Sequence, residues 1–291
     1  MRFCRFFADP IHPGDARLTA DASRLGVVRG DGIHDVTAVL DALPALRWPF
    51  PREDQVIANF ATLRPRMEDL ADKSPAIPLA KVRLLSPVAN PNKILLGVAN
   101  YPEHVAATKK QPREHGMFIK ATSALVGASE GVELRNTERL TVHETELAII
   151  IGKKGTNIPK ERAFDYILGY SIGMDITMRG DETPSYNKSF DTFGVLGPWV
   201  VTREEITQPN NLDIRLWLNG ELRQDETTSR MVLDVPSMIE FASSVMTLYP
   251  GDIFMTGNPK GASRIAPGDM MLAEIESIGR MEVAVRAEKK S

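Results

Sequence analysis

The segment 143-HETELAIIIGKK-154 places two glutamates at the start of the most apolar run of the chain. The run from Leu147 to Ile151 predicts a buried strand. Because side chains alternate along a strand, Glu144 and Glu146 are expected to point to one face, within reach of a single ion. Carboxylates are rarely buried unless they are paired or bind a metal, and close neighbours raise each other's pKa unless a cation intervenes. The segment therefore marks either a solvated strand edge or a cation site.

A third acid, Asp175, lies near the end of a second apolar strand that is expected over residues 166–177. The chain has neither a cysteine cluster nor the H-E-x-x-H motif of zinc proteases. Oxygen ligands alone favour a hard ion, Mg²⁺, Mn²⁺ or Ca²⁺. Residues 179–199 are rich in charge, glycine and proline, which is typical of a long functional loop, and Lys188 within it can meet an anionic substrate.

The composition is that of a soluble globular protein with a substantial core, because 43% of the 291 residues are apolar and 25% are charged. A net charge of −3 without a basic block gives no indication of nucleic acid or an anionic membrane as a partner. The N-terminus lacks the apolar core of a signal peptide, and no stretch approaches the ~20 apolar residues of a membrane span. Together with a lone cysteine, Cys4, these features lead us to expect a cytoplasmic protein.

Residues 1–85 are expected to form a small N-terminal α+β domain. Short strands are predicted over residues 2–7 and 24–28, a short helix over 36–43 and a longer helix over 52–71. Gly30-Asp31-Gly32 predicts a hairpin turn, and Pro65 should kink or split the longer helix. Residues 74–91 are punctuated by prolines and form the expected linker.

Residues 90–288 are expected to form a mainly β domain with few helices. Strands are predicted over residues 93–98, 141–152, 166–177, 199–202, 212–219, 253–256 and 270–275. Asn219-Gly220 predicts another hairpin turn. One helix is expected to begin near Pro236 and to end before Pro250.

Seven short motifs give the chain a resemblance to a known family. They are 97-GVANYPEH-104, 118-FIK-120, 144-ETELAIIIGKKG-155, 169-GYSIGMDIT-177, 188-KSFDTFGVLGPW-199, 250-PGDIFMTGNPKG-261 and 277-SIGRM-281. Over residues 93–285, with these motifs in this order, the sequence resembles the fumarylacetoacetate hydrolase (FAH) family. The resemblance implies an FAH-like catalytic domain, built as a roll of mixed β-sheets and usually part of a homodimer.

The resemblance also implies a divalent ion, usually Mg²⁺, that is held by Glu144, Glu146 and Asp175. A 2-oxo acid or 1,3-dicarbonyl substrate is expected to chelate that ion. The charge of the ion then stabilises the enolate that develops in the reaction, which is the chemistry shared by the members of the family.

By the same resemblance, His104 activates the water that attacks the remote carbonyl, and Lys188 and Thr256 hold the substrate carboxylate. Further candidate substrate-binding residues are Tyr101, Lys120, Arg179 and Glu182. An internal ion pair would explain Lys120 and Arg179 equally well.

Several positions depart from the family pattern. Ala107 stands where a glutamate usually orients the catalytic histidine, and Glu114 can take that role if residues 104–115 fold as a lid over the substrate. A solvated surface loop is the alternative for this segment. Glu182 would repel a substrate carboxylate unless it is protonated or paired, and Asn258 replaces the usual threonine.

Three functions remain open. The first is a metal-dependent hydrolase that cleaves a C–C bond in an acylpyruvate-like 2,4-dioxo acid, as in the catabolism of aromatic compounds. The second is a decarboxylase or tautomerase (isomerase) that acts on oxaloacetate-like or ring-cleavage 2-oxo acids. It needs no activated water, so the loss of the glutamate at position 107 costs it less. The third is a metal-binding homologue without catalysis, and the candidate site residues argue against it.

Overall fold

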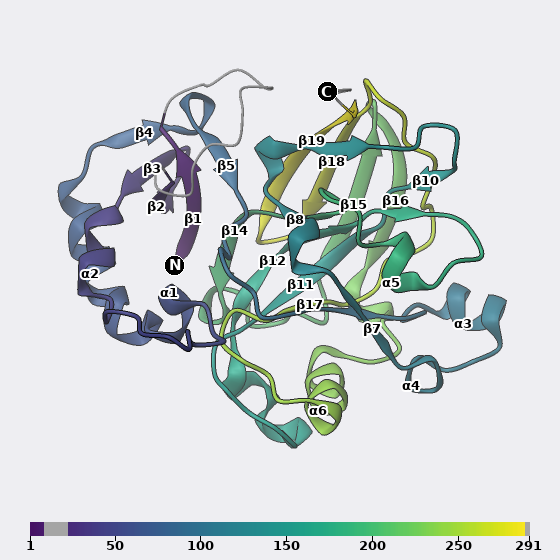
Figure 1. Cartoon of the computed structure of the whole chain (residues 1–291), viewed down its shortest axis with the longest axis horizontal. Helices are drawn as coiled ribbons and strands as arrows, with labels where there is room; N and C mark the ends of the chain where they lie inside the picture. Colours follow the sequence, from purple (N-terminus) through teal and green to yellow (C-terminus); the bar gives the residue numbers. More distant parts are fainter. Residues whose placement is uncertain (9–22, 289–291) are drawn as a thin grey trace.

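One large sheet runs through most of the molecule (Figure 1). A computed structural model describes residues 1–8 and 23–288, and within these residues the sheet has twelve strands. Its main path runs in the order β4 (Ala76–Pro78), β3 (Gly32–Asp35), β2 (Arg24–Arg29), β1 (Arg2–Phe7), β14 (Gly194–Thr202), β12 (Ile167–Asp175), β11 (Thr145–Ile151), β17 (Ile253–Met255), β6 (Ile94–Gly97) and β7 (Met117–Lys120). In addition, β5 (Arg83–Leu85) pairs with β1, and β8 (Leu125–Val126) pairs with β14.

Two smaller sheets complete the β structure of the described residues. The five-stranded sheet has the order β16 (Glu221–Thr227), β15 (Asp213–Leu218), β18 (Met270–Ile275), β19 (Gly279–Ala287) and β9 (Val132–Leu134). The two-stranded sheet consists of β10 (Thr141–Val142) and β13 (Thr177–Met178). Parallel pairs such as β17–β6 and β19–β9 occur among mostly antiparallel ones. The predicted fold class, mainly β with mixed sheets in an α+β chain, is confirmed.

The helices of the described residues are mostly short. The α-helices are α1 (Gln55–Ala58), α2 (Phe60–Lys73), α3 (Pro102–Thr108), α4 (Pro112–His115), α5 (Pro184–Asn187) and α6 (Val235–Val245). The helix predicted over 52–71 is split, but at Asn59 and not at Pro65, which lies inside α2. The Asn59 side-chain amide donates to the Gln55 carbonyl at 2.9 Å, so it competes with the backbone for helical hydrogen bonds at that point.

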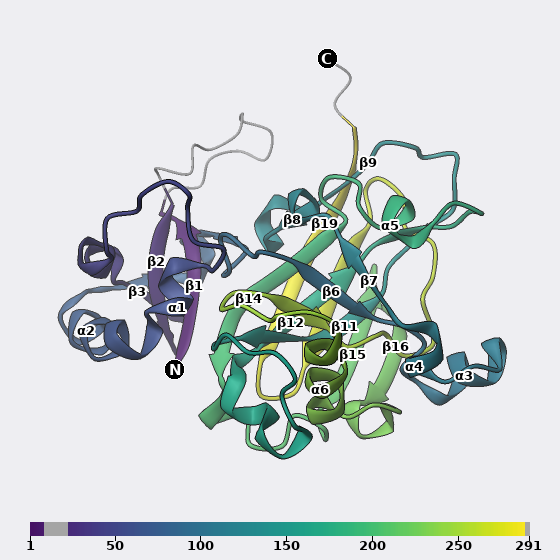
Figure 2. The same cartoon turned by 60° about the horizontal axis from the view of Figure 1, so that its bottom comes forward.

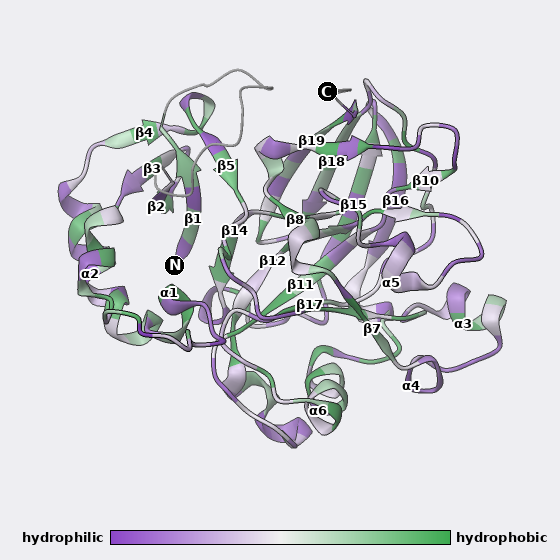
Figure 3. Cartoon of the chain, in the orientation of Figure 1, coloured by the Kyte–Doolittle hydropathy of each residue, from purple (hydrophilic) through white to green (hydrophobic). Residues whose placement is uncertain are grey.

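The burial of β11 explains why its apolar residues do not alternate with polar ones. All seven of its residues are buried, so both faces of the strand are covered. Leu147, Ile149 and Ile151 belong to one hydrophobic core, whereas Ala148 and Ile150 belong to a second core on the other face. Figure 3 shows hydrophobic residues along β11, and Figure 2, with the bottom of the molecule turned forward, shows α6 in front of the strands in that view.

The N-terminal strands belong to the same sheet as strands of residues 90–288. In the β1–β14 pairing, Arg2 is opposite Val201 and Phe3 is opposite Val200. The segment 74–91, which was expected to be a linker, itself contains β4 and β5. The division into domains of residues 1–85 and 90–288 stays a prediction, because both parts share one sheet and its cores.

Both predicted hairpin turns are present. Gly30 connects β2 to β3 with a φ of 56°, and the β15–β16 turn has φ values of 52° at Asn219 and 83° at Gly220. Two consecutive positive φ angles are the requirement of the type I′ turn that Asn-Gly favours. None of the described helices is long and apolar enough to cross a membrane.

Candidate metal centre and substrate site

The structure brings Glu144, Glu146 and Asp175 together as buried carboxylates, each with an oxygen within 4.8 Å of the others. The antiparallel pairing of β11 with β12 places Glu146 opposite Gly173. The predicted continuous strand over 141–152 is wrong in detail, because the chain breaks between β10 and β11 at His143 and Glu144. Glu144 therefore reaches the cluster from the end of the strand and not by simple alternation.

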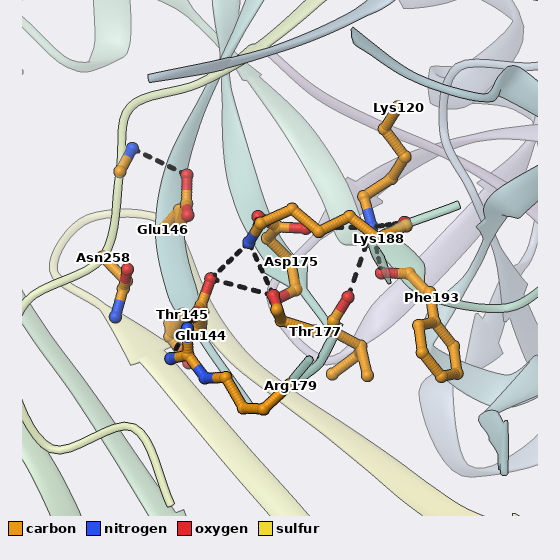
Figure 4. A network of polar contacts seen from close by, with 12 residues as sticks. Lys120, Glu144, Thr145, Glu146, Asp175, Thr177, Arg179, Lys188, Phe193 and Asn258 are labelled. Carbon is orange, nitrogen blue, oxygen red and sulfur yellow. Dashed lines mark hydrogen bonds and ion pairs between the residues drawn. The ribbon is translucent and has the colours of Figure 1, made fainter. Parts of the chain in front are cut away.

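Three cations contact two of these acids, Glu144 and Asp175 (Figure 4). Lys188 Nζ donates to Glu144 Oε2 at 2.7 Å and also to Asp175. Lys120 Nζ lies 2.9 Å from Asp175 Oδ1, and Arg179 donates to Glu144 Oε1 at 2.9 Å. The internal ion pairs that the sequence left open for Lys120 and Arg179 are thus formed, and both are made with candidate metal ligands.

The cluster shifts the pKa of Asp175, Glu146 and Lys188. Burial alone would raise the pKa of Asp175, but Lys120 and Lys188 outweigh it and hold that pKa below its usual value. Burial raises the pKa of Glu146 well above its usual value, and the neighbouring Asp175 and Glu144 raise it further. Burial would lower the pKa of Lys188, yet Asp175 and Glu144 raise it. The position between the carboxylates therefore favours a positive charge.

These residues fit a divalent ion. Glu146 accepts a 2.7 Å hydrogen bond from the Gly257 N–H, and it forms no ion pair with the described cations. The Lys188 ammonium, placed between Glu144 and Asp175, shows that this position attracts a cation. Three carboxylates without sulfur or imidazole ligands suit a hard ion such as Mg²⁺ or Mn²⁺.

Unpartnered polar atoms lie on the other residues predicted for the site. Tyr101 Oη, His104 Nε2 and Thr256 Oγ1 are buried without a hydrogen-bond partner among the described residues. Burial raises the pKa of Tyr101, and the nearby Glu146 raises it further, so the phenol stays a hydrogen-bond donor. The Asn100 side chain donates to the Thr256 carbonyl at 2.9 Å and holds the start of α3 against this strand end. Buried groups without partners are typical of a surface that receives a ligand.

Glu114 does not pair with His104 in this structure. Its carboxylate accepts a 2.7 Å hydrogen bond from the Gln111 N–H and so caps α4. The neighbouring Arg113 contacts α6 through a 2.8 Å ion pair with Glu240. A role for Glu114 in catalysis stays a prediction, and it requires the side chain to leave its cap.

Glu182 forms an ion pair with Arg139. Such a pair is the condition under which Glu182 would not repel a nearby substrate carboxylate. Both of its oxygens accept hydrogen bonds of 2.7 Å from Arg139, and this pair lowers the pKa of Glu182 to about 2. Arg139 was not among the site residues predicted from the sequence. Neither was Thr177, whose hydroxyl lies 3.1 Å from Glu144 Oε2 and contacts Lys188. Thr177 lies two positions after Asp175, and this spacing in an extended chain was the available signal.

A roll of mixed sheets that buries three carboxylates, with lysines and unpartnered donors beside them, defines a metal-dependent enzyme acting on a small molecule. Residues 93–286 match the family model of the fumarylacetoacetate (FAA) hydrolase C-terminal domain. The chain belongs to this family, as its motifs indicated.

Similarity to individual proteins extends over most of the chain. The maleylpyruvate hydrolase of Aquipseudomonas alcaligenes is 44% identical over 300 residues, covering 99% of this chain and 100% of that protein. The crystal structure of maleylpyruvate hydrolase from Sphingobium sp. SYK-6, in complex with manganese(II) and pyruvate, aligns with a TM-score of 0.83 and 38% identity, covering 99% and 100% of the two chains. The mitochondrial oxaloacetate tautomerase of Xenopus laevis is 34% identical over 272 residues, covering 88% of this chain and 84% of that protein.

Proposed function

We propose that this protein hydrolyses an acylpyruvate, a 2,4-dioxo acid such as maleylpyruvate, to a carboxylic acid and pyruvate. The observation that carries this proposal is the buried carboxylate cluster of Glu144, Glu146 and Asp175. The hydroxyls of Tyr101 and Thr256 lie nearby and have no hydrogen-bond partner in the part of the chain that the structure describes. The full-length similarity to two maleylpyruvate hydrolases, one of them crystallised with manganese and pyruvate, supports the choice of substrate class.

The reaction balances with water as the second substrate. Water adds to the acyl carbonyl carbon, the bond between that carbon and the methylene breaks, and the electron pair passes into the enolate of pyruvate. The proton released by the water ends on the methylene carbon, which gives pyruvate. A bound divalent ion supplies a Lewis acid that stabilises the negative charge on the 2-oxo acid part of the substrate.

The side chains of the chain itself bind the substrate and move the proton. His104 Nε2 is free to accept the proton of the attacking water, because it has no hydrogen-bond partner among the described residues. The Thr256 hydroxyl and the Lys188 ammonium bind the substrate carboxylate by donating hydrogen bonds to it. Lys120 keeps Asp175 ionised. Arg179, whose side chain is half exposed, forms an ion pair with Glu144.

We extend the proposal to the metal, the assembly and the setting. Mg²⁺ or Mn²⁺ is the proposed ion, since both prefer oxygen ligands, and Ca²⁺ is a weaker candidate. A homodimer is proposed, and the strongly exposed side chains of Trp48 and Phe50 support it as apolar contacts for a second copy. A cytoplasmic role in degrading ring-cleavage products of aromatic compounds fits such a substrate.

Tautomerisation or decarboxylation of an oxaloacetate-like acid is the second candidate. One observation favours it: Ala107 provides no carboxylate for His104, and Glu114 is engaged with the Gln111 N–H. A reaction that only moves a proton, or releases carbon dioxide, needs no such partner. The similarity to an oxaloacetate tautomerase is consistent with this chemistry.

One experiment separates the two candidates. The purified protein is loaded with Mg²⁺ or Mn²⁺ and incubated separately with a small acylpyruvate and with oxaloacetate, and the products are identified by chromatography. Hydrolysis gives equal amounts of a carboxylic acid and pyruvate from the acylpyruvate. Unchanged acylpyruvate, together with fast keto–enol exchange or carbon dioxide release from oxaloacetate, would reject the hydrolase and support the second candidate.

A further inference from the structure

Gln224 is a buried amide on a strand that is otherwise largely exposed. It lies on β16, at the edge of the five-stranded sheet, and its side chain is completely buried. Its neighbours Arg223 and Asp225 point outward and form exposed ion pairs. Neither the family motifs nor the reaction described above gives Gln224 a role, so its contacts require their own explanation.

The Gln224 side chain connects two segments of the site. Its Oε1 accepts a 3.1 Å hydrogen bond from the N–H of Thr145, the residue between Glu144 and Glu146. Its Nε2 donates to the Pro259 carbonyl at 2.9 Å, in the loop that follows Thr256. One side chain therefore spans from the carboxylate segment to the loop of the proposed substrate hydroxyl.

The loop over residues 256–261 is also held from its other sides. The Gly257 N–H donates to Glu146 Oε2 at 2.7 Å, and Figure 4 shows Asn258 in the neighbourhood of Glu146. At Gly261 a Cβ atom would come within 2.0 Å of the Arg223 carbonyl, so the loop lies directly on the β16 backbone. The loop is thus fixed between β16 and the carboxylate cluster, and Gln224 is the side chain that joins both.

His143 adds a second connection at the same place. Its Nδ1 lies 3.3 Å from Gln224 Oε1, and its Nε2 lies 2.8 Å from Ser263 Oγ. The His143 N–H also donates to the Ser263 carbonyl at 3.2 Å. His143 therefore connects the break between β10 and β11 to Ser263, which follows the loop, and to Gln224.

We infer that Gln224 is a positioning residue, which sets the distance between the metal-binding carboxylates and the Thr256 hydroxyl. Its loss removes one of the connections between the Thr145 backbone and the Pro259 loop, so the distance between the ion and the substrate carboxylate is held less firmly, although the hydrogen bond from the Gly257 N–H to Glu146 remains. This inference rests on the proposed function for the role of Thr256. The part that concerns the carboxylates does not depend on which reaction the protein catalyses.

Two variants test the inference. Gln224→Met keeps the length of the side chain but removes both hydrogen-bonding groups, whereas Gln224→Asn keeps the amide on a side chain one methylene too short to reach both partners. Asp225→Asn, on the outward face of the same strand, is the matched control. Mn²⁺ affinity is measured by titration calorimetry, and pyruvate affinity is measured on the Mn²⁺-saturated protein. Steady-state kinetics with an acylpyruvate complete the set, and unfolding curves establish that each variant is folded.

Both Gln224 variants should bind Mn²⁺ about 10-fold more weakly, the scale on which groups behind metal ligands act. With Mn²⁺ saturating, pyruvate should also bind about 10-fold more weakly, and KM for the acylpyruvate should rise by more than kcat falls. Asp225→Asn should match the wild type. A folded Gln224 variant with Mn²⁺ and pyruvate affinities within twofold of the wild type would overturn the inference, even if the variant melts earlier.

The measurements also separate this inference from the proposed function. If the wild type does not hydrolyse acylpyruvates, the proposed function fails, yet the Mn²⁺ comparison still decides whether Gln224 positions the carboxylates. If Gln224→Met does not fold, Gln224→Asn provides the same comparison with a polar side chain. Weaker Mn²⁺ binding with unchanged pyruvate binding would reject the coupling to the Thr256 loop.

Discussion

The backbone N–H of Asp175 donates a 2.8 Å hydrogen bond to the carbonyl oxygen of Glu144. This bond joins the end of β12 to the residue just before β11, and it aligns the two carboxylates on one side of the paired strands. Glu146 joins them from within β11, opposite Gly173. A short stretch of antiparallel pairing therefore assembles the three acids of the proposed metal centre.

Replacing Glu146 by glutamine should remove the metal without disturbing the fold. The amide oxygen of glutamine still accepts from the Gly257 N–H, and burial of a neutral group relieves the repulsion from the two other acids. We expect Mn²⁺ affinity and turnover to fall by about 10²-fold or more, since a ligand matters at least as much as the groups behind it. Titration calorimetry measures the Mn²⁺ affinity, and the exposed Glu221→Gln is the control. Full activity of Glu146→Gln in the presence of a chelator would show that the site is wrongly assigned.

Lys188→Met should destabilise the metal-free protein more than the metal-loaded one. Without the ammonium, Glu144 and Asp175 lose a shared buried partner, and breaking such a pair costs about 3–5 kcal/mol of the free energy of unfolding. Saturating Mn²⁺ should narrow the difference, because the ion supplies positive charge at the same carboxylates. Urea unfolding with and without Mn²⁺ tests this against the exposed control Lys81→Met. An equal loss of the free energy of unfolding with and without Mn²⁺ would contradict the idea that the ion and the Lys188 ammonium serve the same carboxylates.

Tyr101→Phe should leave the protein at least as stable and make it a poorer enzyme. Among the described residues the buried Tyr101 hydroxyl has no hydrogen-bond partner, and a group in that state costs about 1–3 kcal/mol. Its removal should raise the free energy of unfolding in the absence of ligand, while KM or kcat for the acylpyruvate worsens. Thermal unfolding and steady-state kinetics on the same preparation provide the comparison. A variant that is both less stable and fully active would place the hydroxyl outside the substrate site.

The pair of Glu182 with Arg139 should give a pH-dependent contribution to stability. The pKa of Glu182 falls from 4.5 to about 2 in the folded state, so the folded protein binds the proton less readily than the unfolded chain does. The contribution is present above pH 4.5 and is lost as the pH falls toward 2. It should be small, because the pair is exposed. Unfolding of the wild type and Glu182→Gln should differ at pH 6 and converge only as the pH approaches 2, and Arg139→Gln should behave like Glu182→Gln.

Glu114→Gln tests whether this side chain leaves its cap to serve His104. Glutamine can still accept from the Gln111 N–H, so α4 should remain capped. If Glu114 orients the imidazole in the closed enzyme, turnover of the acylpyruvate should fall by about 10²-fold, the scale of losing a group in acid–base catalysis. Metal affinity should not change.

The reaction with oxaloacetate is the control for that variant, because it uses no activated water. A loss confined to hydrolysis supports a role beside His104. Equal losses in both reactions would indicate a general defect of the segment 104–115, and unchanged hydrolysis would remove Glu114 from the mechanism.

Local chemistry in the sequence was sufficient for much of the fold. Asn219-Gly220 predicted the β15–β16 turn, because only such residues readily take two positive φ angles. The strand β16 itself was missed, since it lies at a sheet edge and buries little besides Gln224. The strand β19 alternates buried and exposed residues along its length, so its signal was present and was overlooked.

The amino-acid sequence was enough to predict the acids Glu144, Glu146 and Asp175 as metal ligands, to locate the long apolar strands that hold them, and to identify the family of the chain. The sharing of the charges, in contrast, became visible only in the folded chain. The fold placed Lys188 between two acids, paired Glu182 with Arg139, and joined Gln224 to both halves of the site. The physical reason is that strand and turn propensities act between near neighbours in the chain. Ion pairs and buried amide contacts depend instead on the register of segments far apart in sequence, which only the packed sheets fix.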